Sequence, residues 1–264
     1  MNVLVCLKHV PDTETRIRVA PGGLDIVREG VNYQVSPYDE FAIEEALRLR
    51  EKFGAGQVTL VTVGPQKAED ALRFGLSMGA DRGIHVRDEA LLGGDPLGTA
   101  AVLAAAVKGE AFDLVLTGKL AIDDYQEQVG ALLAERLGLP SVSLVTRLEV
   151  APDKARATVT RDIEGGREVV EVTLPAVLTC QKGLNEPRYP SLPNIMKAKK
   201  KPIDLKDAAA LGVDPAAVGP KGAKVTLLEL TTPPPREAGK RLDGDPATQA
   251  ATLVRLLREE AKVV

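Results

Sequence analysis

The chain has 264 residues, of which 44% are hydrophobic and only 3% aromatic, and it carries no tryptophan and a formal net charge of −3. This length allows one large α/β domain with appendages, or two small domains, with a sizeable core. The scarcity of aromatic rings and the absence of a basic excess argue against a nucleic-acid partner.

The N-terminal sequence MNVLVCLKHV lacks the basic start and long apolar stretch of a signal peptide. No apolar run approaches the length that crosses a bilayer. The two cysteines, Cys6 and Cys180, lie in apolar runs typical of strands, which favours buried, reduced thiols. We therefore expect a cytoplasmic protein that is not membrane-embedded.

The first half of the chain alternates between strand and helix patterns. Continuous apolar runs, typical of parallel strands buried on both faces, lie at Val3–Leu7, Val58–Val63, Gly83–Val86 and Leu114–Thr117. Helix patterns follow them at residues 37–53, Lys67–Met78, Pro96–Lys108 and Gln126–Leu137. This alternation predicts an α/β fold with a doubly wound, mostly parallel, Rossmann-like sheet.

The second half has a different pattern. Three strands are predicted at Val142–Val150, Arg156–Ile163 and Glu168–Leu174, with Gly165-Gly166 as the turn of a β-hairpin insert. The apolar run Ala176–Cys180 is expected to return to the main sheet. A polar, alanine-rich stretch then covers Pro202–Val218.

The C-terminal segment is predicted to be an extended arm. It contains a predicted strand at Val225–Leu230, a proline linker at residues 233–235, and a helix from Asp245 to Lys262. Asp245 is a suitable cap for this helix, and apolar residues recur along one face of it. The arm either packs on a partner or folds back on its own domain, and the pattern does not decide between the two.

Residues 184–201 (LNEPRYPSLPNIMKAKKK) form the most unusual segment. Pro187, Pro190 and Pro193 exclude a regular helix or an inner strand, since each proline lacks a backbone donor. The segment nevertheless carries the apolar residues Leu184, Tyr189, Leu192, Ile195 and Met196. A stiff, apolar-tipped loop beside a basic run is suited to contacting another protein.

A ligand site is expected where strands end at the switch point of the sheet. Three segments should converge there, namely Cys6–His9, residues 63–65 and Gly118–Asp124. Gly118 permits close backbone approach, and the helix start near Gln126 suits a phosphate. The segments match neither a Walker loop nor GxGxxG, so the pattern indicates only that a nucleotide is possible.

The sequence offers no catalytic set. His9 and His85 are the only histidines, no cluster has metal-ligand spacing, and no GxSxG is present. The adjacent carboxylates Asp123 and Asp124 suit either contact with a ribose or favourable charges at a helix start. We therefore predict neither a catalytic residue nor a metal site.

Four stretches carry a resemblance to a known family: VREGVNYQVSPYDEFAIEEALRL from Val27, GADRGIHV from Gly79, GKLAIDD from Gly118, and RDIEGGREVVEVTLPAVLTC from Arg161, which leads towards residues 184–201. Over essentially its full length the chain resembles the β subunits of electron-transfer flavoproteins. The resemblance implies a heterodimer with an α subunit that holds most of a redox-active FAD. It also implies a Rossmann-like, adenine-nucleotide-hydrolase-like domain with a buried AMP, and an arm that embraces the α subunit.

The family accepts electrons from acyl-CoA and related dehydrogenases of fatty acid β-oxidation and passes them to a membrane quinone reductase. The resemblance places Tyr38 near the flavin and makes Leu192 the anchor of a dehydrogenase-docking loop, residues 184–201. It assigns cofactor binding to Cys6, Ser36, Pro37, Tyr38, Asp39, Val63, Gly118, Ala121, Ile122, Asp123, Gln126, Glu127, Gln128 and Val129. We expect a nucleotide-binding domain at residues 1–220 and an arm at residues 221–264.

Glu127 and Val129 depart from the family, because many relatives have asparagine and threonine there, beside the AMP phosphate. Electron-bifurcating relatives bind a second FAD in this pocket, but their usual glycine is Asp124 here, which favours AMP. A stand-alone nucleotide-binding module is the second hypothesis, although it gives the insert, loop and arm no purpose. An adenylating enzyme is the third, but the SGGxDS loop it needs is absent. The main hypothesis is an electron-carrier subunit without a substrate of its own.

Overall fold

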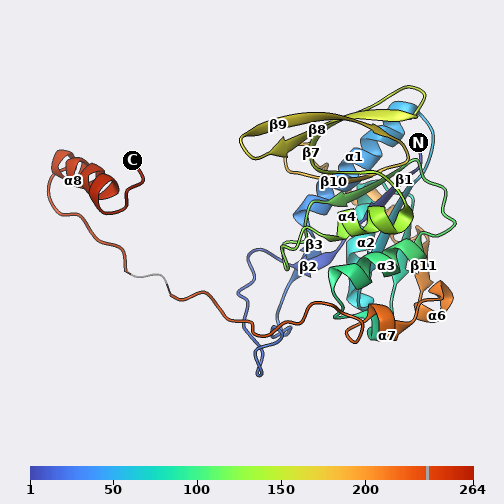
Figure 1. Cartoon of the computed structure of the whole chain (residues 1–264), viewed down its shortest axis with the longest axis horizontal. Helices are drawn as coiled ribbons and strands as arrows, with labels where there is room; N and C mark the ends of the chain where they lie inside the picture. Colours follow the sequence, from blue (N-terminus) through green and yellow to red (C-terminus); the bar gives the residue numbers. More distant parts are fainter. Residues whose placement is uncertain (236–237) are drawn as a thin grey trace.

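A nine-stranded sheet with helices on both faces forms the body of the protein, and the C-terminal helix stands apart from it (Figure 1). The computed structural model describes residues 1–235 and 238–264. The sheet order is β11-β5-β4-β1-β6-β10-β7-β8-β9, parallel from β11 to β7 and antiparallel beyond. The predicted doubly wound, mostly parallel α/β fold is confirmed.

The bounds of the elements are close to the sequence patterns in most places. The sheet strands are β1 (Val3–Cys6), β4 (Val58–Val63), β5 (Arg82–Val86), β6 (Leu114–Gly118), β7 (Ser141–Val150), β8 (Arg156–Ile163), β9 (Gly166–Thr173), β10 (Val177–Cys180) and β11 (Ile203–Lys206). A separate two-stranded ribbon joins β2 (His9–Pro11) to β3 (Tyr33–Val35). The α-helices are α1 (Pro37–Phe53), α2 (Glu69–Met78), α3 (Pro96–Ala106), α4 (Val129–Leu137), α5 (Leu192–Ala198), α6 (Ala208–Leu211), α7 (Pro215–Val218) and α8 (Pro246–Glu259).

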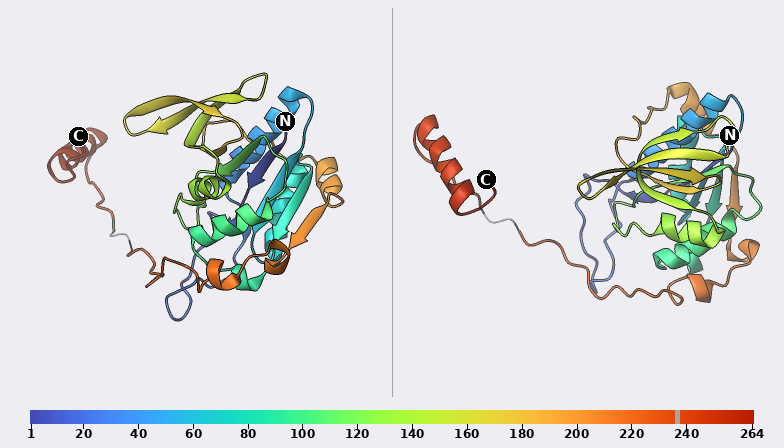
Figure 2. Two further views of the ribbon diagram at one scale, coloured as in Figure 1. Left: turned by 45° about the vertical axis from the view of Figure 1, so that its right-hand side comes forward. Right: turned by 45° about the horizontal axis from the view of Figure 1, so that its top comes forward.

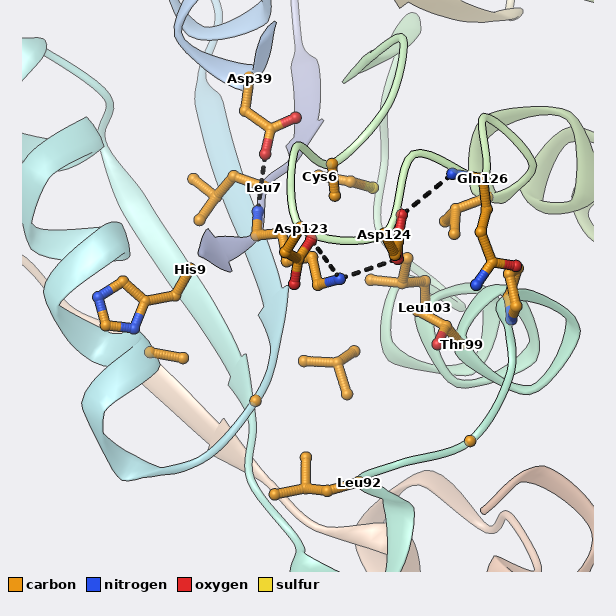
Figure 3. A pocket seen from close by; sticks show the side chains of 18 of the residues that line it. Cys6, Leu7, His9, Asp39, Leu92, Thr99, Leu103, Asp123, Asp124 and Gln126 are labelled. Atoms are coloured by element: carbon orange, nitrogen blue, oxygen red, sulfur yellow. Dashed lines mark hydrogen bonds and ion pairs between the residues drawn. The ribbon is translucent and has the colours of Figure 1, made fainter. Parts of the chain in front are cut away.

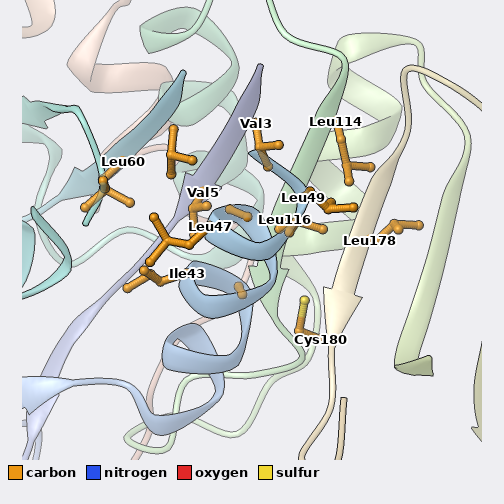
Figure 4. Packing of buried hydrophobic residues seen from close by; sticks show 14 of the residues in the cluster. Val3, Val5, Ile43, Leu47, Leu49, Leu60, Leu114, Leu116, Leu178 and Cys180 are labelled. Atoms are coloured by element: carbon orange, nitrogen blue, oxygen red, sulfur yellow. The ribbon is translucent and has the colours of Figure 1, made fainter. Parts of the chain in front are cut away.

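Alternation along the central strands divides the core between the two faces of the sheet. Val3 and Val5 pack with helices α1 and α2, whereas Leu4 and Cys6 pack with α3 and α4. Figure 4 shows the first of these clusters, in which α1 covers β1, β4 and β6. Successive strand residues point to opposite faces, so a continuous apolar run is what a doubly covered strand requires.

Helix boundaries follow local capping signals where such signals exist. Helix α1 begins at Pro37, and Gly54 ends it in the left-handed conformation at φ 66°. The predicted start of α4 at Gln126 is wrong, since the helix begins at Val129. Tyr125 and Glu127 have φ values of 53° and 55°, so the chain is still turning there.

The β-hairpin insert is confirmed, because β8 and β9 pair antiparallel around a tight turn in which Gly165 has φ 78°. Strand β10 returns between β6 and β7, as predicted. The edge strand β11 was not predicted from the polar, alanine-rich stretch. The predicted strand at Val225–Leu230 is wrong, because that segment has no regular structure. It runs from the start of α3, where the N–H of Lys224 donates to Asp95, to the loop at Gly23, and it pairs with no strand of the sheet.

The exclusion of a helix from residues 184–201 was also wrong in part. Residues Leu192–Ala198 form helix α5, and Pro193 lies in its first turn, where the missing backbone donor has no intrahelical partner to lose. Both cysteines are free and buried, as predicted. Among residues 1–235 and 238–264, no helix is both long enough and apolar enough to span a membrane.

The arm extends away from the domain. Two further views show α8 beyond the body of the protein at the end of a long extended segment (Figure 2). None of the residues of α8 is buried. The structure therefore shows the helix of the arm away from its own domain and not packed back on it. Residues 236 and 237 of the predicted arm lie outside the described residues, and the predicted boundary at residue 220 stays a prediction.

Candidate functional site

A cavity of about 1130 Å³ opens at the C-terminal ends of β1, β4 and β6. Its lining includes Cys6 from β1, Val63 from β4 and Gly118 from β6. Strand order reverses between β1 and β6, so this is the switch point of the doubly wound sheet. The three segments that sequence reasoning expected to converge do converge here.

Most of the predicted cofactor residues surround this cavity. The lining contains Cys6, Asp39, Val63, Gly118, Ala121, Asp123, Gln126, Glu127, Gln128 and Val129. Ser36, Pro37, Tyr38 and Ile122 are not part of the lining. Ser36 is buried, and its hydroxyl donates to the carbonyl of Leu120 at 3.4 Å. Ser36 therefore fixes the loop that follows β6.

A buried carboxylate joins helix α1 to two strand ends. Asp39 Oδ2 accepts the backbone N–H of Lys8 at 2.7 Å, and Oδ1 accepts that of Gly118 at 2.9 Å. Burial raises the pKa of Asp39 to about 7, and these two hydrogen bonds offset part of that rise. Both oxygens face donors, so Asp39 fixes the ends of β1 and β6 at the cavity.

Two lysines of the cavity, Lys8 and Lys119, are paired with nearby carboxylates, and the pairs of Lys8 are drawn in Figure 3. Lys8 Nζ lies 2.9 Å from Asp123 and 3.0 Å from Asp124. Burial lowers the pKa of Lys8, but the two aspartates raise it by more, so the amine stays charged. Lys119 Nζ lies 3.4 Å from Glu127. Glu127, one of the two positions that depart from the family, thus pairs with a neighbouring lysine.

Helix α4 begins at this cavity without a side-chain cap. Its first backbone N–H groups therefore lack an intrahelical or side-chain acceptor, which suits an anion at the helix start. Gly130 in the first turn packs so closely that a Cβ would lie 2.5 Å from a methyl of Thr179. The lining of the cavity thus combines the backbone N–H groups at the start of α4 with two lysine side chains, those of Lys8 and Lys119.

Sequence reasoning did not name several residues that line the cavity, among them Lys8, Thr99 and Leu103. Lys8 directly follows the apolar run of β1, so its position at a strand end was the available signal. Thr99 and Leu103 of α3 lie on the wall opposite Asp39 (Figure 3). They have no local motif, because only the packing of α3 on the sheet brings them to the cavity.

A second candidate surface lies on residues 184–201, which we call the docking segment. Its apolar side chains are exposed, with Tyr189 at 96%, Leu192 at 79%, Met196 at 63% and Ile195 at 40%. Leu184 differs from them, because it is partly buried against the core. The structure therefore gathers four of the five predicted docking residues on one exposed stretch, and Leu184 holds that stretch to the domain.

Comparison with known proteins identifies the family. The sequence profile described as "Electron transfer flavoprotein domain" matches residues 23–211. The chain belongs to the electron transfer flavoprotein family. It is 44% identical over 265 residues to "Electron transfer flavoprotein subunit beta" of Bacillus subtilis, covering all of both chains. It is 42% identical to the protein of that name from Syntrophomonas wolfei, over 100% of this chain and 98% of the relative.

The likeness extends beyond bacteria. A mitochondrial electron transfer flavoprotein subunit beta of Arabidopsis thaliana is 40% identical over 264 residues, with full coverage of both chains. The human subunit beta is 41% identical over 92% of this chain and 93% of the relative. The matches to the Bacillus and Arabidopsis relatives span the whole chain, so this protein is an electron transfer flavoprotein component.

Proposed function

We propose that this chain is the β subunit of a heterodimeric electron carrier whose α subunit holds most of a redox-active FAD. The uncovered arm is the observation that carries the proposal. Leu253 and Val254 of α8 are 48% and 50% exposed, and Leu228 of the extended segment is 87% exposed. An amphipathic helix needs a second surface for its apolar face, and residues 1–235 and 238–264 bury no residue of α8.

The cavity is proposed to bind AMP as a structural nucleotide. The residues fit such a group, since an uncapped helix start and Lys8 lie beside a glycine that permits close approach. When AMP is bound, the phosphate would lie at the start of α4, with Lys8 and Lys119 as its cations. Asp123 and Asp124 would then exchange part of their pairing with Lys8 for contacts to the ribose.

The size of the cavity favours one alternative, a second FAD in place of AMP. A volume of about 1130 Å³ exceeds the upper range of roughly 1,000 Å³ for ordinary small-molecule pockets. Leu92, Thr99 and Leu103 contribute to its lining. Asp124 argues for AMP, because electron-bifurcating relatives usually have a glycine there, whereas here Asp124 pairs with Lys8 at 3.0 Å.

The docking segment is proposed to receive acyl-CoA dehydrogenases and related donors of fatty acid β-oxidation. Leu192 is the proposed anchor, because it is 79% exposed on a stiff segment and a few well-placed side chains carry most of the binding energy of an interface. Tyr38, whose ring lies 5.2 Å from Lys119 Nζ, is proposed to approach the flavin. The electrons would then pass to a membrane quinone reductase. FAD carries the redox chemistry, so the subunit needs no acid–base residues or substrate of its own.

Co-expression with the α subunit tests this proposal. The purified complex should be yellow, and mass spectrometry of the released nucleotides should give AMP and one FAD. Two FAD molecules without AMP would establish the alternative. A colourless complex that no dehydrogenase reduces would refute the electron-carrier function. The cytoplasmic location stays a prediction.

A further inference from the structure

The first half of the docking segment is bound to helix α1 by one arginine. Arg188 donates from Nε and Nη2 to the two oxygens of Glu44, at 2.8 and 3.1 Å. Its Nη1 and Nη2 also donate to Glu51, at 2.6 and 3.2 Å. Glu44 and Glu51 lie about two turns apart on the same helix, so one guanidinium spans both. Pairing with two oxygens of a carboxylate fixes orientation as well as distance.

This contact is not an ordinary surface ion pair. The side chain of Glu44 is 4% exposed, whereas that of Arg188 is 35% exposed. Burial raises the pKa of Glu44, but hydrogen bonds from Arg188 and Arg48 lower it by more. The backbone N–H of Arg188 donates to the same carboxylate at 3.2 Å. The docking segment is therefore attached by its main chain as well as by its side chain.

A buried asparagine strengthens the same attachment. Asn185 Nδ2 donates to Glu45 Oε2 at 2.9 Å and to the carbonyl of Phe41 at 3.0 Å. Asn185 and Arg188 thus contact one face of α1 over three of its turns. Leu184, just before them, packs against the core. Residues 184–188 follow the surface of α1 as a fixed strap.

The far end of the docking segment is held by a second arginine. Arg73 of α2 donates from Nη1 to the carbonyls of Ala198 and Lys201, both at 2.9 Å. Glu69 holds the guanidinium of Arg73 at 2.9 Å. Lys201 Nζ in turn donates to the carbonyl of Leu76 at 3.0 Å. The residues at the end of α5 are therefore hydrogen-bonded to α2, through the side chain of Arg73 and the carbonyl of Leu76. Lys201 is one of the bound residues and not a free basic side chain.

We propose that Arg188 and Arg73 are positioning residues, which hold residues 189–196 in the shape that a dehydrogenase binds. The inference rests on the docking function proposed for Leu192. Tyr189, Leu192 and Met196 lie exposed between the two attachments. Because this stretch is ordered on folding, binding need not supply that ordering entropy, which strengthens the complex. The arginines act through the segment and make no contact with the donor themselves.

The test uses the heterodimer with an acyl-CoA dehydrogenase and octanoyl-CoA, with the heterodimer as the varied substrate. In Arg188→Gln combined with Glu44→Gln, no buried carboxylate loses its partner. We expect the KM for the heterodimer to rise about ten-fold, with kcat and bound flavin unchanged.

Two further variants serve as comparisons. Arg188→Lys keeps the positive charge but loses the planar guanidinium that pairs with two carboxylate oxygens, so the KM of this variant should also be raised. Arg48→Gln is the matched control, because Arg48 pairs with the same Glu44 from within α1. Its KM should stay unchanged.

A double-mutant cycle separates positioning from general damage. Leu192→Ala alone should raise KM, and adding the Arg188 change should then raise it by less than about two-fold, because the anchor is already lost. An effect of Leu192→Ala without an effect of the Arg188 change would overturn the positioning role and leave docking intact. Full additivity would also overturn it. No effect of Leu192→Ala would refute the docking function itself.

Discussion

The docking segment and the C-terminal arm both expose apolar side chains, but the protein holds them in opposite ways. The docking segment is attached at both ends, through Arg188 to α1 and through Arg73 to α2. The extended part of the arm contacts the domain through its backbone: the N–H of Lys224 donates to Asp95 Oδ2 at 2.6 Å, and that of Leu230 donates to the carbonyl of Gly23 at 2.7 Å. None of α8 is buried. One surface is fixed to the domain by side chains at both ends, whereas the helix of the other stands away from the domain.

This difference matches two kinds of partnership. An ordered tip loses little entropy on binding, so it suits a donor that arrives and leaves in each turnover. A long arm that packs only on a partner loses more entropy, but it buries a large apolar area in return. The arm therefore suits a permanent subunit. Four experiments test the contrast.

The largest effect should come from charges on the apolar face of the arm. Val254→Asp combined with Leu257→Asp removes two apolar side chains that we expect the α subunit to cover. Their loss should cost at least about 3 kcal/mol of binding free energy. Affinity for the α subunit should then fall more than about 100-fold. Ultracentrifugation of the separately purified chains measures it. The melting temperature of the isolated β chain should not change, and Arg255→Ala, in an exposed pair with Glu259, should be nearly silent.

Hydrogen exchange should show the next largest difference. On pairing with the α subunit, amides of α8 should exchange at least about ten-fold more slowly, because the helix gains a packing surface. Amides of residues 184–188 should change by less than about three-fold, since α1 already holds them. Equal protection of both segments in the isolated β chain would contradict the comparison.

Acid should release the docking segment by a smaller amount. The folded pKa of Glu44 lies below its usual 4.5, so its ion pair stabilises the attachment above that pH. As pH falls through the folded pKa, protonation removes this contribution. Exchange of residues 184–188, corrected for its intrinsic rate, should rise below pH 4.5, and burial raises the pKa of Glu45, the partner of Asn185, so any change from that group comes at higher pH. The Glu44→Gln variant should lack this step, and a step that persists there would assign the release to another group.

The smallest effect on the KM is expected from two exposed lysines that follow α5, Lys199 and Lys200. Replacing Lys199 and Lys200 with glutamine should raise the KM for the heterodimer by less than about three-fold, because rim charges mainly affect the association rate. The difference should vanish at high salt. A larger effect that is independent of salt would place these lysines inside the interface.

Local patterns predicted the framework of the protein because its strands and helices have strong local signals. The apolar run of β1 and the glycine that ends α1 are examples. The predicted ends of β1, β4 and β6 also gave the position of the cavity.

Prediction from the sequence failed for the features that depend on contacts between distant parts of the chain. Strand β11 is an edge defined by its pairing with β5, and Leu103 reaches the cavity only through packing of α3. The start of α4 was placed too early, because Tyr125 and Glu127 have positive φ values although neither is a glycine, so nothing in the sequence indicated the turn.

The attachment of the docking segment has a consequence for protein engineering. Every contact that Arg188 and Arg73 make with side chains or carbonyls lies outside residues 189–196. Those eight positions therefore form an exchangeable cassette. Grafting the corresponding stretch of another family member between Arg188 and Lys197 should redirect the choice of electron donor, while the nucleotide cavity and the arm remain as they are.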